Sequence, residues 1–66
     1  MIAYVAKLEW HGALDPDNHG TDEEVFLAYS DEHARARAQE IAEEERSELV
    51  QLRRVMGDGT EKEIDS

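Results

Sequence analysis

The sequence predicts an α+β fold: a three-stranded antiparallel-type sheet with strand order 2-1-3, and one helix on one face (a ββαβ chain). Three observations predict it. The chain opens with an alternating apolar stretch, a helix with an alanine stripe lies near the middle, and two more short apolar stretches flank that helix. The expected element order is strand, strand, helix, strand.

Residues 1–11 predict the first strand, because apolar residues recur there at every second position. The apolar face holds Ile2, Tyr4, Ala6, Leu8 and Trp10. Ala3 and Val5 make the opposite face partly apolar, which suits a central strand. Residues 12–24 contain the only proline and two of the four glycines, and predict a long loop. Residues 24–29 then predict a second strand with apolar groups on both faces.

Residues 30–46 predict the helix, with Ser30 as a cap that accepts a backbone N–H. Its apolar stripe is narrow and consists of Ala34, Ala38, Ile41 and Ala42. No glycine closes this helix, and three acids at residues 43–45 oppose its dipole, so we expect its carboxyl end to fray. Residues 49–56 predict the third strand.

A crossover through the helix makes the second and third strands parallel and leaves the first between them, antiparallel to both. Residues 1–56 then form one domain. Residues 57–66 begin with the turn signal Gly57-Asp58-Gly59 and form either a polar tail or a short fourth strand.

The charge balance narrows the expected partners. Seventeen acidic and seven basic residues give a formal charge of −10, which disfavours direct binding to nucleic acid or anionic membranes and favours a basic protein partner. Solubility or adaptation to high salt would explain the same excess. The chain has no cysteine, and its start lacks the pattern of a signal peptide or a membrane span, so we expect a cytoplasmic protein.

Two acidic sets are candidates for binding a basic partner. The acidic ridge, on the helix and just beyond it, consists of Glu40, Glu43, Glu44 and Glu48. The loop acids are Asp15, Asp17, Asp22 and Glu23. The ridge could present carboxylates in place of nucleic-acid phosphates, and a solvated helix face is the alternative interpretation. The sheet face opposite the helix, with Val5 and Phe26, is a candidate dimer face.

No pattern indicates an enzyme or a cofactor. Ser30 is explained as a helix cap, and the three histidines have no recurring spacing to a nucleophile. The loop also presents Asp15, Asp17 and His19 at the first, third and fifth positions of a calcium-loop pattern, but the twelfth position is Phe26. A divalent-metal loop is therefore a third hypothesis, and we assign no metal ligands.

The layout resembles that of small phage and mobile-element proteins, including some anti-CRISPR proteins. The matching segments are M-I-A-Y-V-A-K-L at the start, A-Y-S-D-E-H-A-R-A-R-A-Q-E-I-A in the middle and L-V-Q-L-R-R-V near the end. The resemblance implies a binder or inhibitor of a host machine, sometimes through DNA mimicry. Together with the two acidic sets, it leads us to expect a small non-enzymatic binding protein, encoded by a phage, that docks on a basic, nucleic-acid-binding protein surface. These families share no catalytic or binding motif, so the resemblance assigns no functional residue to this chain. The alternative function, from a different functional class, is a structural homodimerisation domain that uses the open sheet face.

Overall fold

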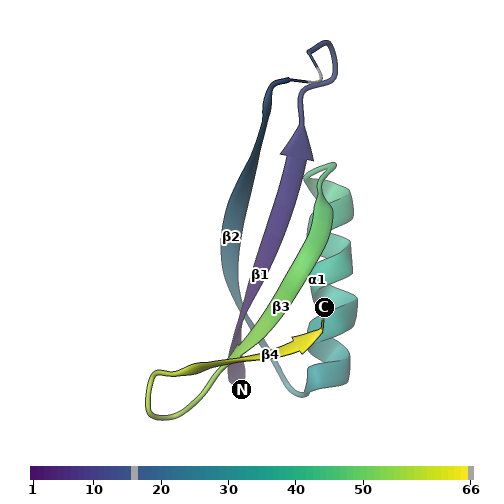
Figure 1. Cartoon of the computed structure of the whole chain (residues 1–66). Coiled ribbons are helices and arrows are strands. Elements are labelled where there is room, and N and C mark those ends of the chain that lie inside the picture. The colour runs from purple at the N-terminus through teal and green to yellow at the C-terminus, as the bar shows by residue number, and fades with distance from the viewer. Residues whose placement is uncertain (16, 66) are drawn as a thin grey trace.

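The computed structural model describes residues 1–15 and 17–65, in which one helix packs on a four-stranded antiparallel sheet (Figure 1). The elements are β1 (Ile2–His11), β2 (His19–Ala28), α1 (Asp31–Glu44), β3 (Glu48–Val55) and β4 (Glu61–Asp65). The strands lie in the order β2-β1-β3-β4. The predicted order 2-1-3 is confirmed, and a fourth strand adds beside the third.

β1 is the central strand, since it pairs with β2 on one side and with β3 on the other, and its middle is buried on both faces. Tyr4, Ala6 and Leu8 belong to the core on the helix side of the sheet and are almost fully buried. On the opposite face Val5 is only 7% exposed. The cover on that side comes from Arg53 of β3, which pairs with Val5 in the strand register and forms ion pairs with Glu23 of β2 and, at 3.0 Å, with Glu61 of β4.

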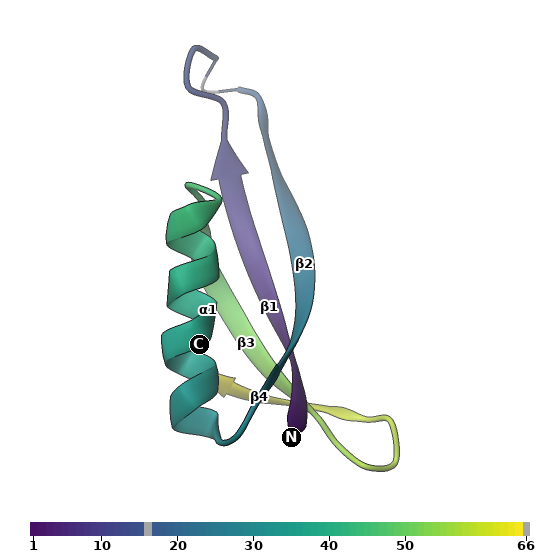
Figure 2. The ribbon, with the colours of Figure 1, turned by 180° about the vertical axis from the view of Figure 1, so that it is seen from behind.

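α1 packs on the sheet through small residues (Figure 2). The predicted stripe is confirmed, since the buried residues of the helix are Ala34, Ala38, Ile41 and Ala42. Alanines bring the helix axis close to the sheet but fill little volume. The volume comes from the strands, whose largest fully buried side chains are Tyr4, Leu8 and Leu52.

The start of α1 is fixed by two interactions. Ser30 is the N-cap, and its hydroxyl accepts the backbone N–H of His33 at 3.2 Å. The Tyr4 hydroxyl donates to Oδ1 of Asp31 at 2.7 Å, and Arg54 of β3 lies 3.5 Å from the same oxygen. Asp31 therefore joins the first helical turn to β1 and β3.

The end of α1 is closed, in contrast to the expected fraying. The backbone N–H of Ser47 donates to the Ala42 carbonyl at 2.8 Å, and that of Arg46 donates to the Glu43 carbonyl at 3.2 Å. This pair of bonds is a Schellman motif. Arg46 occupies the position that glycine usually takes, with φ of 53°.

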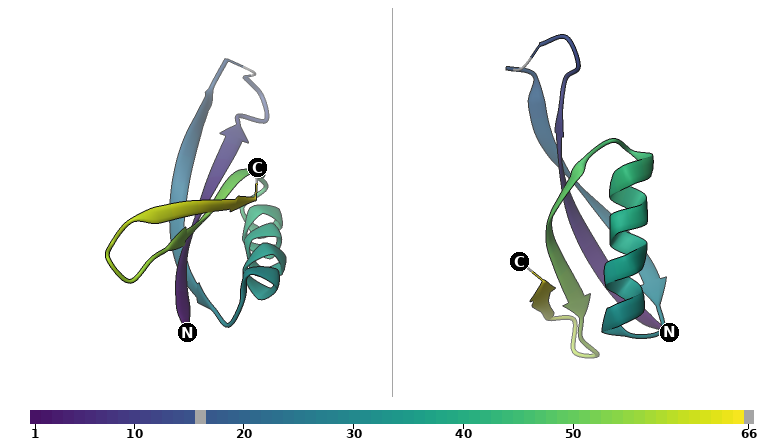
Figure 3. Two further views of the ribbon diagram at one scale, coloured as in Figure 1. Left: turned by 60° about the horizontal axis from the view of Figure 1, so that its bottom comes forward. Right: turned by 90° about the vertical axis from the view of Figure 1, so that its right-hand side faces the viewer.

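β2 begins at His19, so it is longer than the predicted strand over residues 24–29. The β1–β2 hairpin extends beyond the carboxyl end of α1 (Figure 3). Asp22 and Glu23 consequently belong to a strand and not to the loop where we expected them. The strand includes these polar residues because it pairs with β1 over ten consecutive positions.

The predicted face of Phe26 is wrong. Phe26 pairs with Tyr4, and the two rings stack with centroids 5.8 Å apart, so Phe26 packs against the core on the helix side. Val25 and Leu27, which pair with Val5 and Ala3, lie on the open face. The alternation within residues 24–29 fits either assignment, and only the hairpin register decides between them.

β3 contains a bulge that sequence alternation alone does not show. Lys7 pairs with Gln51 and Leu8 pairs with Leu49, so Val50 is the extra residue. The bulge lets Leu49 and Leu52 both pack toward the core.

No helix in the described part of the chain has the length and apolar character needed to cross a bilayer.

Candidate protein-binding surface

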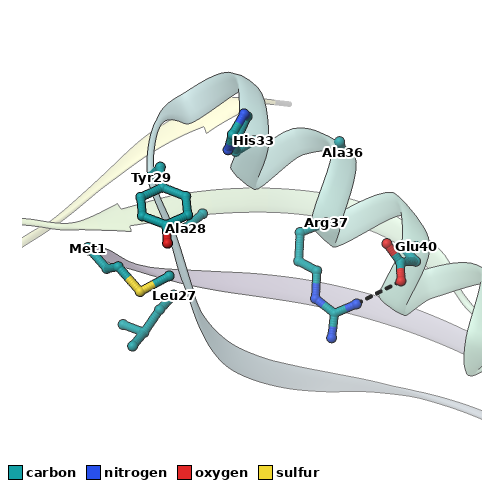
Figure 4. Close-up of a pocket in the computed structure, with 8 residues that line it drawn as sticks. All are labelled: Met1, Leu27, Ala28, Tyr29, His33, Ala36, Arg37 and Glu40. Carbon is teal, nitrogen blue, oxygen red and sulfur yellow. Dashed lines mark hydrogen bonds and ion pairs between the residues drawn. The ribbon is translucent and has the colours of Figure 1, made fainter.

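A hollow of about 280 Å³ lies between the end of β2 and the first turns of α1 (Figure 4). The hollow is lined by Met1, Leu27, Ala28 and Tyr29 at the chain start and the end of β2, and by His33, Ala36, Arg37 and Glu40 of α1. Leu27 and Tyr29 are 58% and 71% exposed. Apolar side chains this exposed offer area to a partner.

A second feature, where the carboxyl end of α1 meets β2, is strongly acidic. The carboxyl of Glu45, at the helix end, is within hydrogen-bonding reach of Glu24 of β2, and the charges of Asp22 and Glu44 act on the same group. We call these four residues the acidic corner. Desolvation, the hydrogen bond with Glu24 and the three neighbouring charges raise the pKa of Glu45 above its ordinary value. Four carboxyl groups of one sign therefore crowd together where two elements meet.

The acidic ridge only partly forms one surface. Glu40 and Glu44 are one helical turn apart and lie on the same side of α1, beside the hollow and in the acidic corner respectively. Glu40 forms an ion pair with Arg37 at 2.9 Å. Glu43 is exposed on the helix, while Glu48 belongs to β3 and pairs with Glu9 of β1.

The loop acids do not gather into one site. The Asp15 carboxylate accepts a hydrogen bond from the backbone N–H of Asp17 at 3.0 Å. Aspartate commonly forms this bond in turns, so it indicates a turn and not a binding site. Asp22 and Glu23 are adjacent in β2, so their side chains point to opposite faces. Asp22 joins the acidic corner, whereas Glu23 is paired with Arg53 on the open face.

The described residues contain no group of three or more histidine and acidic side chains arranged to hold a metal ion. His19 of the proposed metal loop and the loop acid Asp22 lie three residues apart in β2, so their side chains are on opposite faces of the sheet. The rings of His11 and His19 are neighbours at the hairpin end, with centroids 5.9 Å apart.

The open face keeps an apolar patch, but its members differ from the expected pair. Val25, 71% exposed, and Leu27 lie beside Val5, while Phe26 lies on the far side of the sheet. The rest of this face is charged, since Arg53 bridges β2 and β4 and Gln51 donates to Glu63 of β4 at 3.2 Å.

Sequence reasoning missed Glu24 and Glu45, although both belong to the acidic corner. The sequence held a signal for Glu24. Glu24 lies two positions before Phe26 in the same strand, so both side chains lie on the same face of the sheet, and the hairpin register shows that this is the helix side. The proximity of Glu45 to that strand depends on how far α1 reaches along the sheet, which alternation does not reveal.

Comparisons of the chain with protein-family models, with curated proteins and with solved structures found no match.

Proposed function

We propose that this chain is a small, acidic, non-enzymatic binding domain that docks on a basic surface of another protein through the β2–α1 side. The observation that carries the proposal is the acidic corner. Like charges held close together oppose folding, and the cost is relieved when a lysine or arginine of a partner lies among them. An overall charge of −10 adds long-range attraction for such a partner.

The apolar hollow between β2 and α1 supports the same proposal. Protein interfaces combine an apolar centre with charged groups that orient the partner. Here Leu27 and Tyr29 supply exposed apolar area at the hollow. Glu40 also lines the hollow, and it lies one helical turn before Glu44 of the acidic corner. The layout shared with small phage and mobile-element proteins is consistent with an inhibitor of a basic host protein, which would be such a partner.

A pull-down with matched variants tests the proposal. The corner variant Glu24→Gln/Glu45→Gln and the loop variant Asp15→Asn/Asp17→Asn each change the formal charge from −10 to −8. We expect a basic protein to be retained at about 50 mM salt and released at about 500 mM. The loop variant should still retain it, and the corner variant should not. Retention that ignores salt, or equal loss in both variants, would refute docking at the corner.

Self-association through the open face is the alternative, and the exposure of Val25 and Leu27 favours it. Two chains of charge −10 repel each other, so this dimer should strengthen as salt is added. Sedimentation at micromolar concentration measures it. A Val25→Lys chain that sediments like the parent chain at high salt would rule out this face.

A further inference from the structure

The two edges of the sheet differ in how well they are protected against another strand. β4, at one edge, has five residues, a register shift against β3 and an exposed Lys62. The Ile64 carbonyl of β4 also accepts a hydrogen bond from Arg35 of α1 at 3.1 Å. Short length, irregularity, lysine and cover by another element are the features that keep an edge from pairing.

β2, at the other edge, lacks these four protections, and its charged residues Asp22, Glu23 and Glu24 are all acids, which repel an acidic strand but not a basic one. It has ten residues, contains neither proline nor lysine, and pairs with β1 over ten consecutive positions without a shift. β2 and β4 are the two ends of the strand order, and Figure 1 shows β2 beside β1 with no strand of the described part of the chain beyond it. Every second residue of β2 therefore presents its backbone N–H and C=O outward.

We propose that β2 accepts an extended basic peptide of a partner protein as an added strand. This inference rests on the proposed function and specifies how the partner binds. Backbone hydrogen bonds to the edge would supply affinity, and the side chains along β2 would select the sequence.

The side chains along β2 indicate the chemistry of the peptide. On the helix side of the sheet, Asp22 and Glu24, with Glu44 and Glu45 beside them, favour lysine or arginine. On the open face, the exposed Val25 and Leu27 favour apolar side chains, so basic and apolar residues should alternate along the added strand. A second copy of this chain fits less well, because its own β2 would bring three more acids and a further −10 of charge to the same edge.

The test uses the ¹⁵N-labelled full chain and a synthetic peptide of about ten residues in which lysine and valine alternate, a length that matches β2. We expect binding, with amide exchange slowed about tenfold or more at every second residue of β2 and unchanged exchange in β4. An otherwise identical peptide with aspartate in place of lysine should not bind. The Asp22→Asn/Glu24→Gln variant should bind the lysine peptide more weakly than the loop variant does.

Each other outcome overturns the proposal in a distinguishable way. If the lysine peptide binds while β2 exchange is unchanged, strand addition is wrong and docking at the acidic corner survives. If the lysine peptide does not bind, strand addition is wrong, and the pull-down with the corner and loop variants decides the proposed function separately. If the aspartate peptide binds equally well, charge does not select the occupant. If β2 amides are already protected without peptide and the chain sediments as a dimer, a second copy occupies the edge.

Discussion

Tyr4→Phe tests whether the contact between β1 and the start of α1 stabilises the fold. The substitution removes one oxygen atom from a fully buried side chain and leaves the aromatic ring, with its stacking on Phe26, in place. The lost interaction is the 2.7 Å hydrogen bond to Asp31. Burial, followed by the hydrogen bond and the charge of Asp31, raises the pKa of Tyr4, so the hydroxyl stays protonated and remains a donor at neutral pH.

The expected cost is about 1.5–2 kcal/mol. Hydrogen bonds to charged groups contribute about 1.5–3 kcal/mol. We take the lower part of that range because Asp31 is partly exposed and keeps Arg54 as a partner at 3.5 Å. In a domain of this size each kcal/mol lowers the melting temperature by roughly 4–8 °C.

Urea unfolding followed by circular dichroism measures the change. Tyr29→Phe is the matched control, since Tyr29 is 71% exposed and should change the free energy of unfolding by less than about 0.5 kcal/mol. Combining Tyr4→Phe with Asp31→Asn in a double-mutant cycle isolates the pair. If Tyr4→Phe costs no more than Tyr29→Phe, or if the cycle shows no coupling, the bond does not hold the helix to the sheet.

Three further predictions concern single positions. Arg46→Gly should be about 1 kcal/mol more stable than Arg46→Ala in urea unfolding, because both remove the charge and only glycine suits φ of 53°; equal stability would contradict a strained helix end. The raised pKa of Glu45 means that folding favours its protonated form, so its contribution to stability is present below the ordinary carboxyl pKa and is lost as pH rises through the folded value. Glu45→Gln should therefore be more stable than the parent at pH about 7, with a difference that shrinks toward pH about 4; a difference independent of pH would argue against crowding. A Cβ at Gly20 would lie 2.8 Å from the Trp10 ring, so Gly20→Ala should shift the fluorescence of this single tryptophan and destabilise the chain by about 1 kcal/mol; an unchanged spectrum would show that the ring is not held there.

Sequence patterns predicted the elements of this fold better than their faces. The alternation of residues 1–11 and the capped alanine stripe after Ser30 were sufficient for β1, α1 and the strand order. The length of β2 was missed because its first half, H-G-T-D-E-E, is polar and has the composition of a loop. The face of Phe26 was missed because a run with apolar residues at successive positions has no preferred side until it is paired.

The candidate site was harder to predict than the fold for a related reason. Asp22 and Glu44 were identified as acids but assigned to two separate sets, and their association depends on where α1 ends along β2. Distances between elements depend on strand register and on packing. The periodicity of residues within one element gives no information about either. The acidic composition was visible in the sequence, and its concentration at one corner was not.

The part of the β1–β2 hairpin that extends past α1 has a practical consequence (Figure 3). Its tip is a turn closed by a 2.6 Å bond from the Gly12 N–H to the Asn18 carbonyl, and exposed residues there include Leu14, whose side chain is fully accessible. The tip lies away from the core and from the hollow, so extra residues inserted into it should leave both unchanged. A fluorophore or an affinity tag placed at this tip would report on binding at the β2 edge without touching it, whereas a tag on Met1 would lie at the hollow itself.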